Sequence, residues 1–168
     1  MLRAAEPSVG TRLRHSMPLI PEVERTIHRT SLVAAVIGAM LSPIPLADEI
    51  VLVPVFAVLT RAIARHRGLP RKEVPWRPII GTALAGLGAR AAINLSVSLL
   101  PGVAAVANAG SAALLTELVG AYVDAACADP KGAKVLSTKQ MTDALRAQLR
   151  ERRAPKWWPS RRSQTVSA

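Results

Sequence analysis

The sequence predicts an all-α protein, in which two apolar helical hairpins form a four-helix membrane-associated bundle, followed by a short basic amphipathic C-terminal helix. Residues 91–116 and residues 30–47 contain no charged side chain over 26 and 18 positions, respectively. Uncharged apolar stretches of 18 or more residues are typical of membrane segments. Proline interrupts both stretches, so a helical hairpin explains each of them better than a single span does.

The first hairpin is expected to begin at Pro21. Proline suits the first position of a helix, and the acidic residues that follow it favour a helix start, so we expect a helix from there to residue 42. Pro43 and Pro45 then break this helix, because each ring removes a hydrogen-bond donor and clashes with the preceding turn. The second helix is expected from residue 46 to about residue 65, with Gly68 ending it.

The second hairpin is expected to turn at Pro101 and Gly102. Its first helix opens at Pro78 and ends near residue 100, and its second helix covers about residues 103–128. Small residues recur at every fourth position of the first of these helices, which gives a flat strip for a neighbouring helix.

The chain is expected to divide into a disordered basic N-terminus (1–20), a helical membrane-associated domain (21–130) and a basic amphipathic tail (131–168). In the tail, Ser137 and Gln140 have the spacing of a capping box, which predicts a helix start. A narrow apolar stripe surrounded by arginines follows and predicts a short basic amphipathic helix.

Aromatic and basic residues flank the apolar segments. Trp76 and Arg77 precede the third helix, and Lys156, Trp157 and Trp158 follow the C-terminal helix. Such residues suit the interface of a bilayer. Two other readings stay open: a loop tryptophan that covers the edge of the domain, and a tail whose tryptophans pack on it.

The formal net charge of +11 points to an anionic partner: phospholipid, nucleic acid or an acidic protein surface. Twenty-one of the 22 basic residues lie in three blocks, 1–30, 61–77 and 131–168, which alternate with the two apolar blocks. If each apolar block is a hairpin, all three basic blocks lie on one side of the membrane. The positive-inside tendency makes that side cytoplasmic and predicts an inner-membrane protein.

A buried polar clasp is expected around Arg90, the one basic residue outside these blocks. An arginine at the centre of a bilayer costs about 2.5–3.5 kcal/mol on insertion scales, so it needs a partner. Counting from the second turn places Glu117 within about one helical turn of the level of Arg90. We therefore expect these two residues to pair, with Asp48 or Glu49 as the alternative partner. Two asparagines at similar depth complete the expected clasp: Asn94 and Asn108.

Three topologies stay open from the sequence: spanning hairpins, shallow re-entrant hairpins and a soluble bundle that docks on a membrane. The uncharged part of the second helix, residues 50–60, is short for a span, which needs about 20 residues.

These patterns resemble a bacterial family of domains of unknown function, number 697 among such families. The resemblance covers about residues 31–128 and rests on the Pro-Ile-Pro-Leu-Ala-Asp run at 43–48, the glycine-rich run at 81–90 and the Leu-Pro-Gly-Val run at 100–103. It departs from the family at Leu46, where the family often has glycine. The resemblance implies an α-helical, membrane-linked module with a small GTPase as a partner, and it supplies no established reaction.

No catalytic constellation is recognised in the sequence, so we expect a chain that is not an enzyme and that uses no cofactor and no metal. The run from Gly86 to Ala91 matches a dinucleotide-binding fingerprint but lacks the preceding strand and the acid about 20 residues later. Cys127 is expected to be a buried apolar residue, and Asp124 and Asp129 are expected to be solvated.

The favoured function is an adaptor or regulator that recruits a cytoplasmic partner to an anionic phospholipid bilayer. A homo-oligomeric channel or transporter subunit is an alternative, and so is a soluble basic helical protein that binds nucleic acid. Nucleic acid is the weaker prediction, because aromatic side chains that could stack on bases make up only 3% of the chain.

Overall fold

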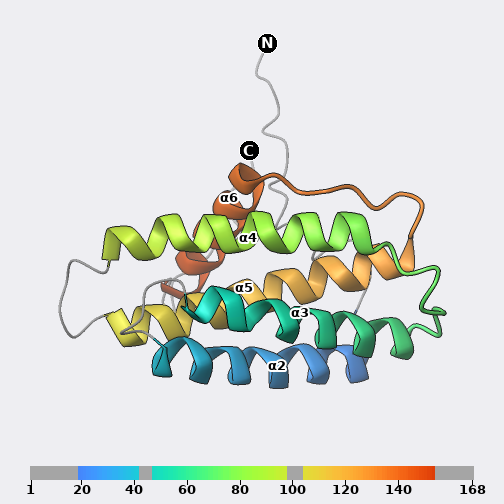
Figure 1. Ribbon diagram of the computed structural model, residues 1–168, viewed down its shortest axis with the longest axis horizontal. Coiled ribbons are helices and arrows are strands. Elements are labelled where there is room, and N and C mark those ends of the chain that lie inside the picture. Colours follow the sequence, from blue (N-terminus) through green and yellow to red (C-terminus); the bar gives the residue numbers. More distant parts are fainter. Residues whose placement is uncertain (1–18, 42–46, 98–103, 154–168) are drawn as a thin grey trace, which may run out of the picture.

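The computed structural model describes residues 19–41, 47–97 and 104–153, and these residues form helices and the connections between them. The five helices are α2 (Pro21–Met40), α3 (Ala47–His66), α4 (Trp76–Val97), α5 (Ala104–Ala128) and α6 (Thr138–Arg153). The predicted all-α class is thus confirmed over the described residues. Helices α2 to α5 lie alongside one another, and α6 crosses them at a steep angle (Figure 1).

The helix ends follow from local chemistry. Pro21 is the first residue of α2, and Glu22 and Glu24 lie in its first turn. Gly68 has a φ of 66°, and it ends α3 in a Schellman motif, because the amide of Leu69 donates to the Ala64 carbonyl at 2.9 Å. This reversal turns residues 69–75 back toward the start of α4.

The start of α6 is the predicted capping box. The Ser137 amide donates to Oε1 of Gln140 at 2.8 Å, and the Gln140 amide donates to Oγ of Ser137 at 3.3 Å. The prediction of a helix that starts just after Ser137 is therefore confirmed.

Helix α5 is the central helix of the described fold. It contacts all four of the other helices, and its contact with α2 is the most extensive in the structure, whereas α3 and α4 barely touch. Small residues allow the close approach of α2 and α5: a Cβ built on Gly38 would lie 2.7 Å from the carbonyl oxygen of Asn108. The buried core contains leucine, isoleucine, valine and alanine from all five helices.

The connection from α5 to α6 is fastened to the bundle. The Tyr122 hydroxyl donates to the Lys134 carbonyl at 2.8 Å, and the Leu136 amide donates to Oγ1 of Thr82 at 3.0 Å. The apolar stripe of α6 is then buried, with Met141 and Leu145 at 1% and 2% exposure. Helix α6 thus packs against α4 and α5, and its apolar side faces protein.

Candidate functional site

One surface of the bundle is aliphatic and exposed. From residue 31 to residue 41, every exposed side chain of α2 is apolar, and so is every exposed side chain of α3 from residue 50 to residue 58. The most exposed of them are Met40 (74%) and Ile50 (73%). We call this set the aliphatic surface: Leu32, Val33, Val36, Met40, Ile50, Val51, Val53 and Val58. Monomeric soluble proteins rarely expose contiguous apolar patches of this kind, so the surface indicates a partner or a lipid phase.

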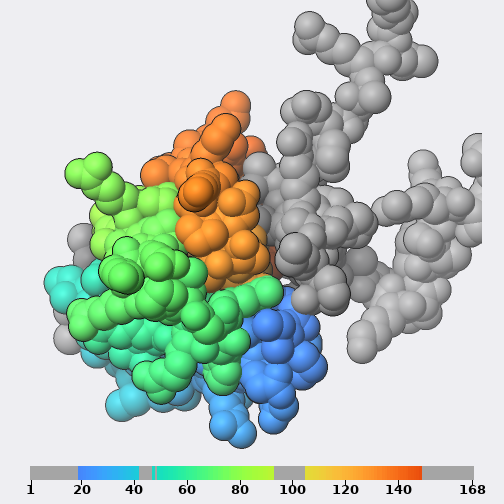
Figure 2. Space-filling view, turned by 90° about the vertical axis from the view of Figure 1, so that its right-hand side faces the viewer, coloured from blue at the N-terminus to red at the C-terminus, as the bar shows by residue number. Residues whose placement is uncertain are grey.

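The opposite end of the bundle is charged. We call it the basic end; it contains the start of α2, the end of α3, the segment 67–77 and the end of α5, which lie together in Figure 2. Six of its residues are Arg or Lys in the range 61–77 alone. Exposed charged side chains on α2 stop at Arg29, and among the side chains of α3 that the structure describes they begin at Arg61. The exposed side chains of α2 and the described exposed side chains of α3 are therefore divided along the helices into a polar half and an apolar half.

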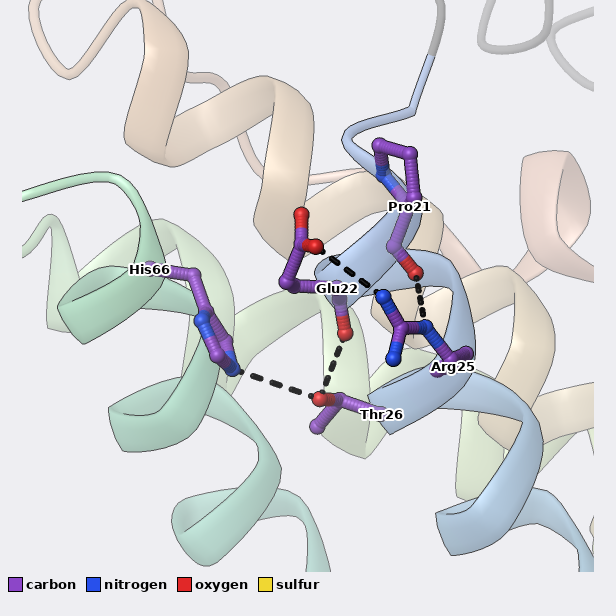
Figure 3. A network of polar contacts seen from close by, with 5 residues as sticks. All are labelled: Pro21, Glu22, Arg25, Thr26 and His66. Carbon is purple, nitrogen blue, oxygen red and sulfur yellow. Dashed lines mark hydrogen bonds and ion pairs between the residues drawn. The ribbon is translucent and has the colours of Figure 1, made fainter.

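A polar network fastens α2 to α3 at the basic end (Figure 3). Arg25 donates to the Glu22 carboxylate at 3.0 Å. The Thr26 hydroxyl donates to the Glu22 carbonyl at 2.8 Å and lies 3.4 Å from Nε2 of His66. The contact of Thr26 with His66 links the two helix ends. Because the side chains of this network are exposed or half-buried, the network forms no enclosed site.

The Arg90 guanidinium is fully buried, at 0% exposure. It pairs with the Glu49 carboxylate at 2.9 Å, and it donates to Oγ of Ser111 at 3.0 Å and to the Asn108 carbonyl at 3.2 Å. This arrangement joins α3, α4 and α5 with one side chain. Because a buried charge is tolerated only when it is paired and hydrogen-bonded, these contacts explain how an arginine can lie inside an apolar bundle.

The other residues of the expected clasp belong to α3, α4 and α5. Glu49 is the alternative partner that the sequence indicated for Arg90, while pairing between Arg90 and Glu117, a half-buried residue of α5, stays a prediction. Asp48 belongs to α3 and Asn94 to α4, and their side chains lie outside the described part.

The expected interface residues lie partly outside the described chain. Trp76 and Arg77 open α4 at the basic end; Trp76 is half-buried, and its indole N–H donates to the Arg71 carbonyl at 3.4 Å. The remaining predicted positions fall outside the described residues: Pro43, Pro45, Pro101, Gly102, Lys156, Trp157 and Trp158.

The sequence did not predict the ion pair between Arg67 and Asp124. The guanidinium donates to both carboxylate oxygens of Asp124 at 2.7 Å, and the two side chains are 15% and 5% exposed. The expectation of a solvated Asp124 is therefore wrong, whereas Asp129 is exposed as expected. The hydrogen bonds that Arg67 donates to the Asp124 carboxylate raise the pKa of Arg67 despite its partial burial. This pair fastens the segment after α3 to α5.

Cys127 lies in the core beside this ion pair, at 4% exposure, which confirms its expected burial. Burial and, to a smaller extent, the charge of Asp124 raise the pKa of the Cys127 thiol, while Arg67 lowers it, and the three effects together give a pKa of about 11. The thiol is therefore an inert apolar group at neutral pH.

Alkylation of Cys127 should show this burial. Since the thiolate is the nucleophile, a pKa of about 11 predicts that the iodoacetamide rate of the folded chain rises about tenfold per pH unit between pH 8 and pH 10. The urea-unfolded chain should level off near pH 9, because its thiol has an ordinary pKa. Mass spectrometry after timed quenching measures both profiles. A folded-state profile that also levels off near pH 9 would contradict the burial.

One described helix is long and apolar enough to cross a membrane, the stretch Ala105–Ala128, and 67% of its most apolar window is buried inside the bundle. Length and composition alone identify it, and the central helix of a protein core passes the same test. Over the described ranges, no group of three or more His, Cys, Asp or Glu side chains could hold a metal ion.

Comparison with known proteins gives no relative: no family model, no curated protein and no solved structure matches this chain. The class of protein is therefore defined by the fold and the surfaces alone: the residues that the structure describes form an all-α bundle with an aliphatic surface and a basic end. The resemblance to family 697 stays an expectation from the sequence.

Proposed function

We propose that this chain is a non-enzymatic, membrane-associated helical module of the inner membrane. Its aliphatic surface lies in the bilayer, and its basic end lies among anionic headgroups on the cytoplasmic side. There the chain recruits a protein partner. The observation that carries this proposal is the aliphatic surface. A solvated bundle would place polar side chains at those positions, as this chain does at the basic end.

The length of the aliphatic surface favours entry from one side of the bilayer. Helix α2 has 11 residues from Thr30 to Met40 without a charge, and α3 has 11 from Ile50 to Thr60. At 1.5 Å per residue each stretch is about 16 Å long, roughly half of a hydrocarbon core that is about 30 Å thick. Shallow insertion therefore explains this pair of helices better than a complete crossing.

The charges support the same placement. The pairing of Arg90 with Glu49 compensates two charges within the apolar half, so neither of them is buried there as an isolated charge. The basic residues of α3 and of the segment after it lie where an apolar half would meet headgroups, and each contributes about 1 kcal/mol on an anionic surface. Both halves of the bundle thus match the layer in which they are proposed to lie.

The proposed partner is a cytoplasmic protein, and the resemblance to family 697 names a small GTPase. The role of an adaptor or regulator rests on that resemblance and on the lack of a catalytic constellation in the sequence. A channel or nucleic-acid function has no comparable observation in its favour.

Flotation with vesicles tests the membrane placement. Purified chain mixed with vesicles of phosphatidylglycerol and phosphatidylcholine should float with the lipid and stay bound in high salt, because apolar contacts are not screened. The variant L32K/V36K should be lost from the lipid fraction, since each lysine in hydrocarbon costs about 2.5–3.5 kcal/mol. Both positions are more than half exposed, so the fold tolerates lysine there.

The matched control is E24K, which changes the net charge by the same two units at the basic end, where Glu24 is exposed. This variant should float as well as the unmodified chain. A chain that stays soluble in low salt without detergent, and that ignores the vesicles, would refute the proposal.

A further inference from the structure

Two cavities follow each other along the seam between α3 and α4, the two neighbouring helices that barely touch. The first, of about 340 Å³, lies at the basic end, and three arginines line it: Arg61, Arg65 and Arg71. The second, of about 170 Å³, continues toward the apolar half and is lined almost entirely by apolar side chains, among them Phe56, Ile80 and Leu84. Trp76 lines both cavities.

The fold builds the basic cavity from two segments. Arg61 and Arg65 are four residues apart on α3, so they lie on one face of that helix. The Schellman motif at Gly68 turns the chain back, and the hydrogen bond from the Trp76 indole to the Arg71 carbonyl holds Arg71 opposite them. Apolar side chains line much of this cavity as well, and the three arginines are exposed. Three positive charges on residues that border one cavity favour an anion that carries several oxygens, such as a phosphate diester.

The apolar groove begins where the arginines end. Successive turns of α3 contribute Thr60, Ala57 and Val53 to it, and α4 contributes Ile79, Ala83 and Leu87. An anionic head beside an extended apolar slot is the shape of a phospholipid. A second copy of this chain would bring its own three arginines to the same place, and like charges there would oppose self-association.

We infer that the α3–α4 seam is a binding site for one anionic glycerophospholipid. Its phosphate lies among Arg61, Arg65 and Arg71, and one acyl chain lies in the groove beside Phe56, Ile80 and Leu84. This inference rests on the proposed membrane placement and adds to it a defined site with a preference for charged headgroups.

Trp76 provides the probe, because it lies at the junction of the two cavities. The chain has three tryptophans, so the background W157F/W158F leaves Trp76 as the one indole. In mixed detergent micelles, phosphatidylglycerol with brominated acyl chains should quench Trp76 at a lower mole fraction than brominated phosphatidylcholine does. At about fivefold for each arginine, the three arginines together predict a preference of about a hundredfold.

Two variants test the basic cavity and the apolar groove separately. R61A/R71A should lose about fivefold of the preference for each arginine removed, and it leaves the Arg71 carbonyl in place for Trp76. The matched control R29A/R146A removes two exposed arginines outside the cavity and should keep the preference. A57F should fill the groove and reduce quenching by both lipids, whereas A105F, at an exposed position of α5, should not.

Four results would overturn the inference. Two concern the preference for phosphatidylglycerol: equal quenching by the two lipids, or an equal loss of the preference in R61A/R71A and R29A/R146A. The other two concern the occupant: displacement of phosphatidylglycerol by inorganic phosphate at matched ionic strength, or a cross-link between two copies of the chain in the groove that A57F abolishes. If the chain floats with vesicles but shows one of these results, the site fails while the membrane placement stands. If the chain neither floats nor is quenched by any lipid, the placement itself fails.

Discussion

Replacing Arg90 by methionine should cost about 3–5 kcal/mol of unfolding free energy, because it leaves the Glu49 carboxylate in the apolar half without its guanidinium. The carboxylate side chain is only 13% exposed, so water cannot fully replace the lost partner. The variant also loses the hydrogen bonds to Ser111 and to the Asn108 carbonyl. Urea titration in mild detergent, followed by far-ultraviolet circular dichroism, measures the change.

The double variant R90M/E49M should recover a large part of this loss, since an apolar pair of similar volume removes both desolvation costs. The control is R146M, in which an exposed arginine of α6 is replaced, and it should change stability by less than about 0.5 kcal/mol. If R90M is as stable as R146M, the buried pair does not hold α3 and α4 together.

Glycine-to-alanine substitutions at two positions of the bundle should change the free energy of unfolding in opposite directions. At Gly38 a new Cβ would lie 2.7 Å from the Asn108 carbonyl oxygen, and backbone atoms in a helix cannot move aside. G38A should therefore force α2 away from α5 and destabilise the fold by about 1–3 kcal/mol. At Gly110 nothing lies within 4 Å of a new Cβ, so G110A should stabilise α5 by about 0.5–1 kcal/mol through helix propensity.

The same urea titration measures both glycine variants. The comparison is informative because the higher helix propensity of alanine alone would raise the stability of both variants, whereas the structure predicts a loss for G38A and a gain for G110A. Stabilisation by G38A would show that α2 and α5 are farther apart than the structure places them.

The sequence predicted the helices well because their ends are decided locally. Pro21, Gly68 and the pair Ser137 and Gln140 each fix a start or a stop through contacts within a few residues, and the structure has helix ends close to all of them. Local signals of this kind do not depend on which helices become neighbours.

The contacts between helices could not be predicted in the same way. Arg67 and Asp124 are 57 residues apart, and the sequence carries no periodic signal that brings them together. Helices α4 and α5 are apolar on all sides, so no stripe shows which face is buried. Depth counting favoured Glu117 as the partner of Arg90, with Asp48 or Glu49 as the alternative. Counting fixes the height of a residue along a helix but not the direction of its side chain, so it could not decide the partner.

The main interface of the bundle, between α2 and α5, has a consequence for synthesis on the ribosome. Gly38 and the Asn108 carbonyl that it meets are about 70 residues apart, and at a translation rate of 5–20 residues per second α2 emerges roughly 4–14 s before its partner. During that interval the first hairpin has an apolar face without its final neighbour. Side chains that the α2–α5 interface buries in the finished bundle therefore stay uncovered by α5 for several seconds of synthesis.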